Sequence, residues 1–109
     1  MKQEFGTPYS ATVTGSSSAS ASQSASAGVR YYITDISVSS DKPNAICQVK
    51  DGATIIWQNV VNGTTGTTIA PYSETFSTPL RCSSGATASV GVDGTANCSA
   101  NLAGFSNNS

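Results

Sequence analysis

The residues that could carry out chemistry are few in this chain of 109 residues, and none of them is a histidine. Histidine is the commonest general base near neutral pH and the commonest metal ligand. Its absence excludes a Ser-His-Asp or Cys-His site within one chain. The acidic residues are the remaining acid–base candidates: Glu4, Asp35, Asp41, Asp51, Glu74 and Asp93. A glycosidase-type pair needs two carboxylates that converge across a cleft, and nothing in this spacing favours one.

Most of these carboxylates have an ordinary structural interpretation. Asp41, Asp51 and Asp93 stand in segments that read as turns, where aspartate commonly bonds to the backbone. Asp35 falls within a run of strand-forming residues, and we expect it to pair with Arg30 or Arg81. A calcium site needs several oxygen ligands gathered locally, and the Asp-x-Asp spacing is absent. The sequence therefore predicts no catalytic residue, no metal site and no cofactor, and so no enzyme.

The three cysteines, Cys47, Cys82 and Cys98, lack the CxxC spacing of zinc and thioredoxin-type sites. One interpretation is that all three are buried free thiols in a chain made in reducing cytoplasm. The other is a disulfide between Cys82 and Cys98, because both lie near the ends of expected C-terminal strands. Cys47 would then be free or would cross-link subunits.

Charge and hydropathy exclude two classes of partner. The five basic residues are scattered among six acidic ones, whereas a nucleic-acid binder normally shows a basic face. No stretch approaches the roughly 20 apolar residues of a membrane span. The N-terminus lacks the apolar run of a secretory signal, so we expect a chain made in the cytoplasm or already processed. We expect neither nucleic acid nor membrane as a partner.

Large apolar side chains are scarce. Apart from Met1, only 24 positions are Val, Ile, Leu, Phe, Trp or Tyr. Small domains bury a low fraction of their surface and are only marginally stable alone. Contact with further copies of the chain or with a scaffold is therefore expected.

The elements that hold these residues read as short strands. In residues 30–39, Tyr32, Ile36 and Val38 alternate onto one face with Thr34. Asp51-Gly52 then separates two apolar runs, which is the signature of a hairpin with a type I′ turn. That register would place Lys50 opposite Ala53 and Val49 opposite Thr54. The expected core residues are Tyr32, Ile36, Val38, Val49, Ile56, Trp57 and Val90.

The rest of the chain continues the pattern. A second hairpin is expected at Asp93-Gly94, with Val90 opposite Asn97. Residues 15–28, rich in Ser and Ala, are either a flexible linker or an edge strand over residues 19–25. Short strands separated by turn signals predict an all-β antiparallel sandwich, jelly-roll-like, with about seven to nine strands. We divide the chain into an N-terminal arm and lead-in (1–18), the sandwich (19–105) and a flexible tail (106–109).

The order of four motifs resembles a known family. Residues 30–34 (Arg-Tyr-Tyr-Ile-Thr), 50–57 (Lys-Asp-Gly to Trp), 76–81 (Phe-Ser-Thr-Pro-Leu-Arg) and the closing Gly104-Phe105 occur in that order after an Ala/Gly-rich lead-in. This succession, over roughly residues 19–105, resembles small virion structural proteins of tailed bacteriophages. The three cysteines depart from the pattern of that group.

The resemblance implies a β-sandwich on the virion surface, made in the host cytoplasm. It would be a capsid decoration (cement) protein that binds the major capsid protein and forms a homo-oligomer, for example a trimer. The resemblance carries over no catalytic residue. We expect Phe5, Pro8 and Tyr9 to contact the partner, because they are apolar residues on a segment that is otherwise hard to bury. The alternative is a head- or tail-fibre domain that binds a host-surface glycan or receptor, with Tyr31, Tyr72 or Trp57 stacking on sugars.

Overall fold

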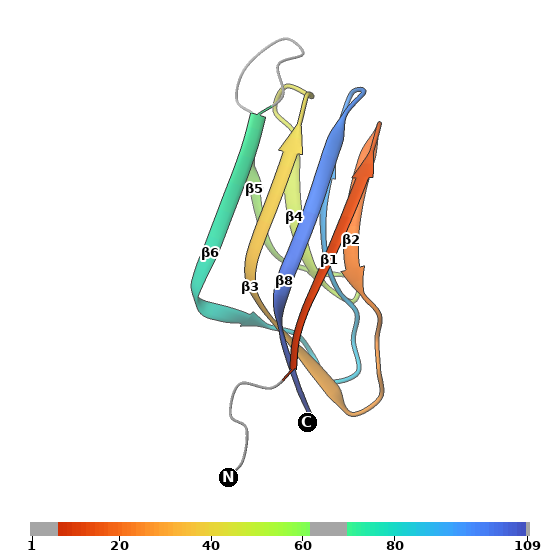
Figure 1. The fold of residues 1–109 in the computed structure, drawn as a ribbon, viewed down its shortest axis with the longest axis vertical. Coiled ribbons are helices and arrows are strands. Elements are labelled where there is room, and N and C mark those ends of the chain that lie inside the picture. The colour runs from red at the N-terminus through yellow and green to blue at the C-terminus, as the bar shows by residue number, and fades with distance from the viewer. Residues whose placement is uncertain (1–6, 62–69, 109) are drawn as a thin grey trace.

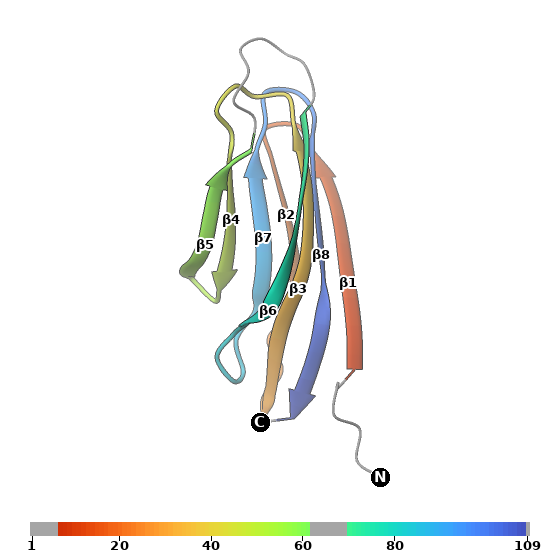
Figure 2. The same ribbon diagram turned by 90° about the vertical axis from the view of Figure 1, so that its left-hand side faces the viewer.

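The computed structural model describes residues 7–61 and 70–108, which form eight strands and no helix. The strands are β1 Thr7–Gly15, β2 Ser18–Gln23, β3 Val29–Ser40, β4 Ile46–Asp51, β5 Thr54–Val60, β6 Ala70–Arg81, β7 Ala88–Asp93 and β8 Cys98–Asn108. They make two antiparallel sheets, in the orders β1-β8-β3-β6 and β2-β7-β4-β5, packed face to face (Figures 1 and 2). This arrangement confirms the expected all-β sandwich. Among the described residues no helix could span a membrane.

The strand order follows one simple rule. β1 pairs with β8, β2 with β7, β3 with β6 and β4 with β5. These are the pairings of one long antiparallel ribbon folded over on itself, which is the jelly-roll arrangement. Among the described strands, only β4 and β5, at the tip of the ribbon, form a hairpin. Every other pair of successive strands crosses from one sheet to the other.

Both hairpin predictions need correction. The β4–β5 hairpin exists, but its turn lies one residue later, with Asp51 opposite Thr54 and Gly52 at a φ of 62°. An irregularity after Val49 then sets Val49 opposite Trp57 instead of Thr54. The expected hairpin at Asp93-Gly94 is wrong, because β7 and β8 belong to different sheets and the segment between them is a crossover.

The sandwich extends beyond the boundaries expected from the sequence. β1 begins at Thr7, inside the expected arm, and pairs along its whole length with β8. β8 in turn continues to Asn108, into the expected tail, beside β3. The Ser/Ala-rich segment forms the edge strand β2, in which Ala19 and Ala21 point into the core and the serines point outward. Of the two interpretations offered for this segment, the edge strand is the one observed.

The core lies between the two sheets. Ile36, Val38, Val49 and Val90, all expected there, are at most 2% exposed. Ile56 and Trp57 are only half-buried and pack against the rim of the core, because they stand on the edge strand β5.

Tyr32 is not a core residue. An irregularity in β3 between Ile33 and Asp35 reverses the alternation, so Tyr31 and Ile33 are buried before it and Ile36 and Val38 after it. Tyr32 therefore faces outward, where its ring stacks on Phe105 with centroids 4.8 Å apart.

Of the two interpretations of the cysteines, the structure shows the free thiols: Cys47, Cys82 and Cys98 are all free and buried, and no disulfide joins Cys82 to Cys98. Along β3, Arg81 lies opposite Tyr32 whereas Cys98 lies opposite Ser40. Eight residues of strand, or roughly 26 Å, therefore separate the two cysteines, far beyond the reach of a disulfide.

A buried carboxylate fastens the crossover between β7 and β8. Asp41 is 3% exposed and accepts four hydrogen bonds of 2.8–3.1 Å from the backbone amides of Thr95, Ala96 and Asn97. Desolvation alone would raise the pKa of Asp41, but these amides outweigh it and hold the pKa below its usual value. Asp41 is expected from the sequence to act within its own turn. Its carboxylate instead acts as a clamp that holds residues 95–97, which are distant in the sequence.

Candidate binding face

The outer face of the β1-β8-β3-β6 sheet is hollowed by a groove of about 280 Å³, lined by residues of all four strands. Alternation turns Ile36 and Leu102 into the core and leaves small side chains on the outside. We call this surface the groove face. Its outward residues are Ser10, Thr12, Asp35, Ser37, Ser73, Thr75, Asn101 and Ala103.

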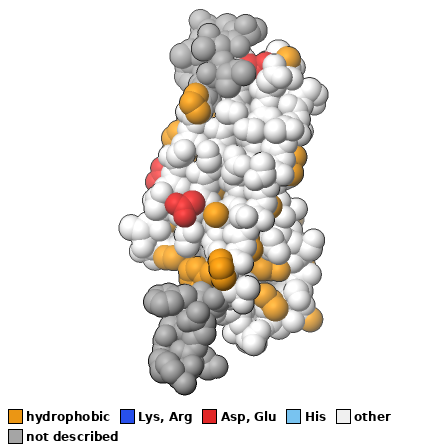
Figure 3. All heavy atoms as spheres, viewed as in Figure 1, with side chains coloured by type: hydrophobic (Ala, Val, Ile, Leu, Met, Phe, Trp, Pro, Cys, Tyr) orange, Lys and Arg blue, Asp and Glu red, His pale blue; other side chains and the backbone are white. Residues whose placement is uncertain are grey.

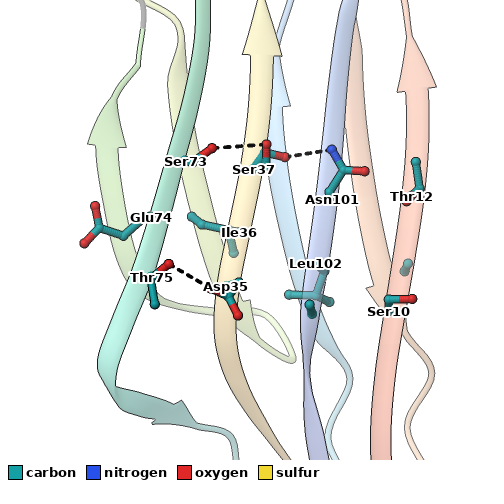
Figure 4. Close-up of a pocket in the computed structure, with 12 residues that line it drawn as sticks. Ser10, Thr12, Asp35, Ile36, Ser37, Ser73, Glu74, Thr75, Asn101 and Leu102 are labelled. Atoms are coloured by element: carbon teal, nitrogen blue, oxygen red, sulfur yellow. Dashed lines mark hydrogen bonds between the residues drawn. The ribbon is translucent and has the colours of Figure 1, made fainter.

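Hydrogen bonds tie the polar side chains of the groove face together across the strands (Figure 4). Thr75 Oγ1 donates to Asp35 Oδ1 at 2.8 Å, which links β6 to β3. Asn101 Nδ2 donates to the Ser37 carbonyl at 3.1 Å, which links β8 to β3. Because these residues stand on paired strands and not on loops, their positions are fixed by the sheet.

The charge of the groove comes from Asp35. Glu74 also lines the groove but points away from its other residues (Figure 4), and its Oε1 accepts a 2.9 Å hydrogen bond from the Tyr72 hydroxyl. No lysine or arginine is among the described residues that line it. The Asp35 carboxylate accepts hydrogen bonds from the Thr34 and Thr75 hydroxyls. Within the described ranges, the ion pair expected with Arg30 or Arg81 is not formed. The groove thus offers hydroxyl, amide and carboxylate groups to a neutral or positively charged surface.

An apolar row crosses the same sheet at one end of the groove. Pro8 lies opposite Phe105, Phe105 opposite Tyr32, and Tyr32 opposite Arg81. We call Pro8, Phe105 and Tyr32 the aromatic row. Figure 3 shows hydrophobic side chains gathered across the lower part of this face, below a middle that is mostly polar. Phe105 and Ala103 are two residues apart on β8, so the row lies about 7 Å from the groove floor.

The residues expected to contact a partner are placed differently from one another. Pro8 is exposed within the aromatic row, whereas Phe5 lies outside the described residues. Tyr9 is half-buried, with its ring edge-on against Tyr31 and its hydroxyl donating to the Tyr32 carbonyl at 3.1 Å. Burial, with smaller contributions from Cys82 and Tyr31, raises the pKa of the Tyr9 hydroxyl well above its usual value. Tyr9 therefore packs within the sandwich.

The aromatic residues suggested for sugar stacking are largely occupied in packing. Tyr31 is 5% exposed, so it offers no surface. Trp57 packs edge-on against Phe76 and beside Tyr72, where it fills the space between the edge strands β5 and β6. The Tyr72 hydroxyl is bonded by both Asn59 and Glu74.

The thiols are poorly suited to nucleophilic chemistry, because all three are buried. Burial raises the pKa of Cys47 to about 12. Burial, with the nearby Asp51 carboxylate, raises the pKa of Cys82 to about 11. Burial also raises the pKa of Cys98. Each is therefore protonated near neutral pH, and the thiol form is the unreactive one.

The groove face is not recognisable in the sequence. Ser37, Thr75 and Asn101 look like ordinary surface residues until the pairing of β3 with β6 and β8 brings them together. The only signal was Asp35, an acidic residue inside a strand. No three His, Cys, Asp or Glu residues of the described ranges gather as a metal site would require.

The described strands thus form a β-sandwich with a polar groove on the outer face of one sheet. No protein-family model matches the chain, and no curated protein sequence matches it.

Proposed function

We propose that this chain is a structural protein of a bacteriophage particle, a capsid decoration protein that binds the major capsid protein through the groove face. The observation that carries the proposal is the groove face itself, a hollow over four strands with an outward-facing, partly exposed apolar row at one end. Protein interfaces use both apolar and polar contacts, and this face offers both, with its apolar row at one end and polar groups at the middle.

Two further arguments support the proposal. The order of the Arg-Tyr-Tyr-Ile-Thr, Lys-Asp-Gly and Pro-Leu-Arg motifs resembles that of tailed-phage virion proteins. Jelly rolls are also common among capsid proteins, although a fold alone does not establish a function. On this proposal the particle surface is where the chain acts, and the capsid shell is its partner.

Binding to empty phage capsids tests the proposal. Thr12→Arg projects a long cation from the edge of the groove, and Pro8→Glu places a charge in the aromatic row. Each variant is expected to weaken capsid binding in co-sedimentation about tenfold or more, which corresponds to ~1.4 kcal/mol. Both residues are exposed on the edge strand β1, so folding should be preserved.

Ser22→Arg is the matched control, because Ser22 is exposed on an edge strand of the other sheet. It is expected to bind capsids like the unmodified chain. If the unmodified chain stays in the supernatant, the capsid proposal is wrong. If all three variants sediment equally with capsids, the groove face is not the attachment surface.

One observation favours a second function, that of a fibre domain that binds a host-surface glycan. Asp35 and Asn101 place a carboxylate and an amide in a groove of about 280 Å³, near the lower limit of small-ligand sites. Such groups exchange hydrogen bonds with sugar hydroxyls, and lectin domains also use jelly rolls.

Retention on immobilised host polysaccharide tests this second function. Asp35→Ala is expected to abolish retention, because it removes the acceptor that also orders Thr34 and Thr75. Asp93→Ala, on a half-exposed carboxylate away from the groove, is expected to leave retention unchanged. Equal retention of Asp35→Ala and the unmodified chain would contradict a glycan site in the groove.

A further inference from the structure

Exposed apolar side chains gather on the β4–β5 hairpin, in the sheet opposite the groove face. Four large hydrophobic residues of the described ranges are exposed, and three of them are Ile46, Ile55 and Val60, at 41–52%. Ile46 and Val60 are direct cross-strand partners. Because Cys47 and Val49 point into the core, the alternation turns these neighbours outward. An apolar surface at the edge of a sheet is typical of a contact with another chain.

Within the part of the chain that the structure describes, the edge strand β5 carries neither of two common protections against pairing, a charge or a proline. Natural edge strands are blocked by charges or prolines that prevent another strand from adding to the sheet. Of the other edges, β1 contains Pro8, β6 contains Pro71 and Pro79 with Glu74, and β2 has only Ser, Ala and Gln side chains. β5, Thr-Ile-Ile-Trp-Gln-Asn-Val, has no charge and no proline but carries exposed isoleucine and valine.

The backbone at the middle of β5 is directed to the open edge. The Val61 amide donates to the Ala45 carbonyl. In an antiparallel pair, every second residue directs its backbone N–H and C=O to the partner strand. Asn59 and Trp57 therefore bond to β4, whereas the backbone groups of Gln58 and Val60 point to the open edge. The Val60 amide is bonded to the Asn59 side chain at 2.9 Å. The amide and carbonyl of Gln58 are therefore the groups placed for a new strand.

We propose that β5 pairs antiparallel with β5 of a second copy of this chain, about a two-fold axis at Gln58. Residue Gln58 then meets Gln58 of the other copy, and Val60 meets Ile56. A side-chain amide is both donor and acceptor, so two identical amides complement each other. The Gln58 Oε1 accepts from Gln48 Nε2 at 3.2 Å, and its second lone pair and the Gln58 NH₂ are available for the two bonds across the axis.

A second copy fits this edge for two more reasons. An edge without charge meets its own copy without like-charge repulsion, and two-fold contacts are the commonest in homo-oligomers. The pairing joins two four-stranded sheets into one and brings the apolar side chains of both hairpins together. The groove lies on the outer face of the other sheet, which is turned away from the sheet that contains β5 (Figure 2), so pairing at the β5 edge leaves the groove face open. The inference therefore does not depend on the capsid proposal.

Sedimentation equilibrium on the purified chain tests the pairing. The unmodified chain is expected to approach twice its mass of 11.0 kDa as concentration rises. Gln58→Lys and Gln58→Glu each oppose like charges across the axis, and each is expected to weaken association at least tenfold. An equimolar mixture of the two variants is expected to restore the dimer, because the lysine introduced in one copy then faces the glutamate introduced in the other.

Ser20→Lys, on the exposed edge strand β2 of the same sheet, is the control and is expected to dimerise normally. A chain that stays monomeric, or that forms a trimer, overturns the proposal. So does a Gln58→Lys variant that dimerises like the unmodified chain, or a mixture that fails to recover the dimer. Because these measurements use no capsid, their failure is distinct from a failure of capsid binding.

Discussion

Replacement of Asp41 by asparagine is expected to lower the melting temperature by roughly 10 °C at pH 7. The carboxylate of Asp41 accepts four hydrogen bonds from the Thr95, Ala96 and Asn97 amides, and these bonds hold the crossover between β7 and β8. An asparagine keeps the shape but turns an NH₂ group toward buried N–H donors. The asparagine NH₂ would then face backbone N–H groups that the carboxylate had accepted from, and these donors would lack an acceptor.

The effect of this variant is expected to depend on pH. The pKa of Asp41 is lowered in the folded protein, so its contribution is complete above the unfolded pKa of about 3.9 and is lost as the pH falls through the folded pKa. The difference in melting temperature between the two proteins should therefore be largest near neutral pH. It should shrink below about pH 4.

Asp93→Asn is the control for this prediction. The Asp93 carboxylate lies 3.7 Å from Lys42 Nζ, and both side chains are about half exposed. Such surface pairs contribute little, so its melting temperature is expected to change by at most about 3 °C. Thermal unfolding followed by circular dichroism between pH 3 and pH 8 measures both variants. Equal melting temperatures for the unmodified chain and Asp41→Asn would show that the clamp does not stabilise the fold.

Gly104→Ala is expected to lower the free energy of unfolding by about 3 kcal/mol. Gly104 stands on β8 beside the irregular part of β3. A methyl group there would collide with the main-chain carbonyl of Tyr32 and would lie 2.9 Å from the Tyr9 hydroxyl. The Tyr32 carbonyl belongs to the main chain and cannot rotate out of the way as a side chain could. β3 and β8 would therefore have to move apart at the aromatic row.

Gly91→Ala is the matched control, because Gly91 also lies in a strand at the middle of a sheet. A methyl group at Gly91 would find its nearest neighbour, the Ala19 carbonyl oxygen, at 3.5 Å, an ordinary contact. Its free energy of unfolding is expected to change by less than about 1 kcal/mol. Urea denaturation measures both variants, and a Gly104→Ala protein as stable as Gly91→Ala would contradict the packing described at Tyr32.

The sequence was informative where the signal is local. Asp51-Gly52 marked the β4–β5 hairpin, which is also the tip of the folded ribbon. Alternation in residues 15–28 allowed an edge strand, and β2 is one. Alternating apolar residues likewise identified Ile36 and Val38 as inward-facing. Each of these features depends on only a few neighbouring residues.

The predictions of register and of side-chain direction were wrong where a shift of one residue changes the pairing or the face of a strand. An extra residue in β3 reverses the face, so Tyr32 points outward although it shares the spacing of Ile36. The one-residue displacement of the β4–β5 turn changed every pair of that hairpin. Asp93-Gly94 has the composition of a turn, but composition does not tell whether the chain returns to the same sheet.

The groove face could not be predicted from the sequence for a related reason. Ser10, Ser37, Ser73 and Asn101 come from four strands that are distant along the chain. Small polar residues at outward positions are common on any sandwich. Only the pairing of β1, β8, β3 and β6 shows that here they border one hollow.

Hydroxyl-radical footprinting of the chain free and bound to empty capsids tests the central proposal most directly. Attachment through the groove face predicts that oxidation of Tyr32, Phe105 and Pro8 falls on binding, since these side chains share one row of the outer surface. Ile55 and Val60, on the opposite sheet, should be oxidised equally in both states. Protection of Ile55 and Val60 with no change at Tyr32 and Phe105 would contradict attachment through the groove face.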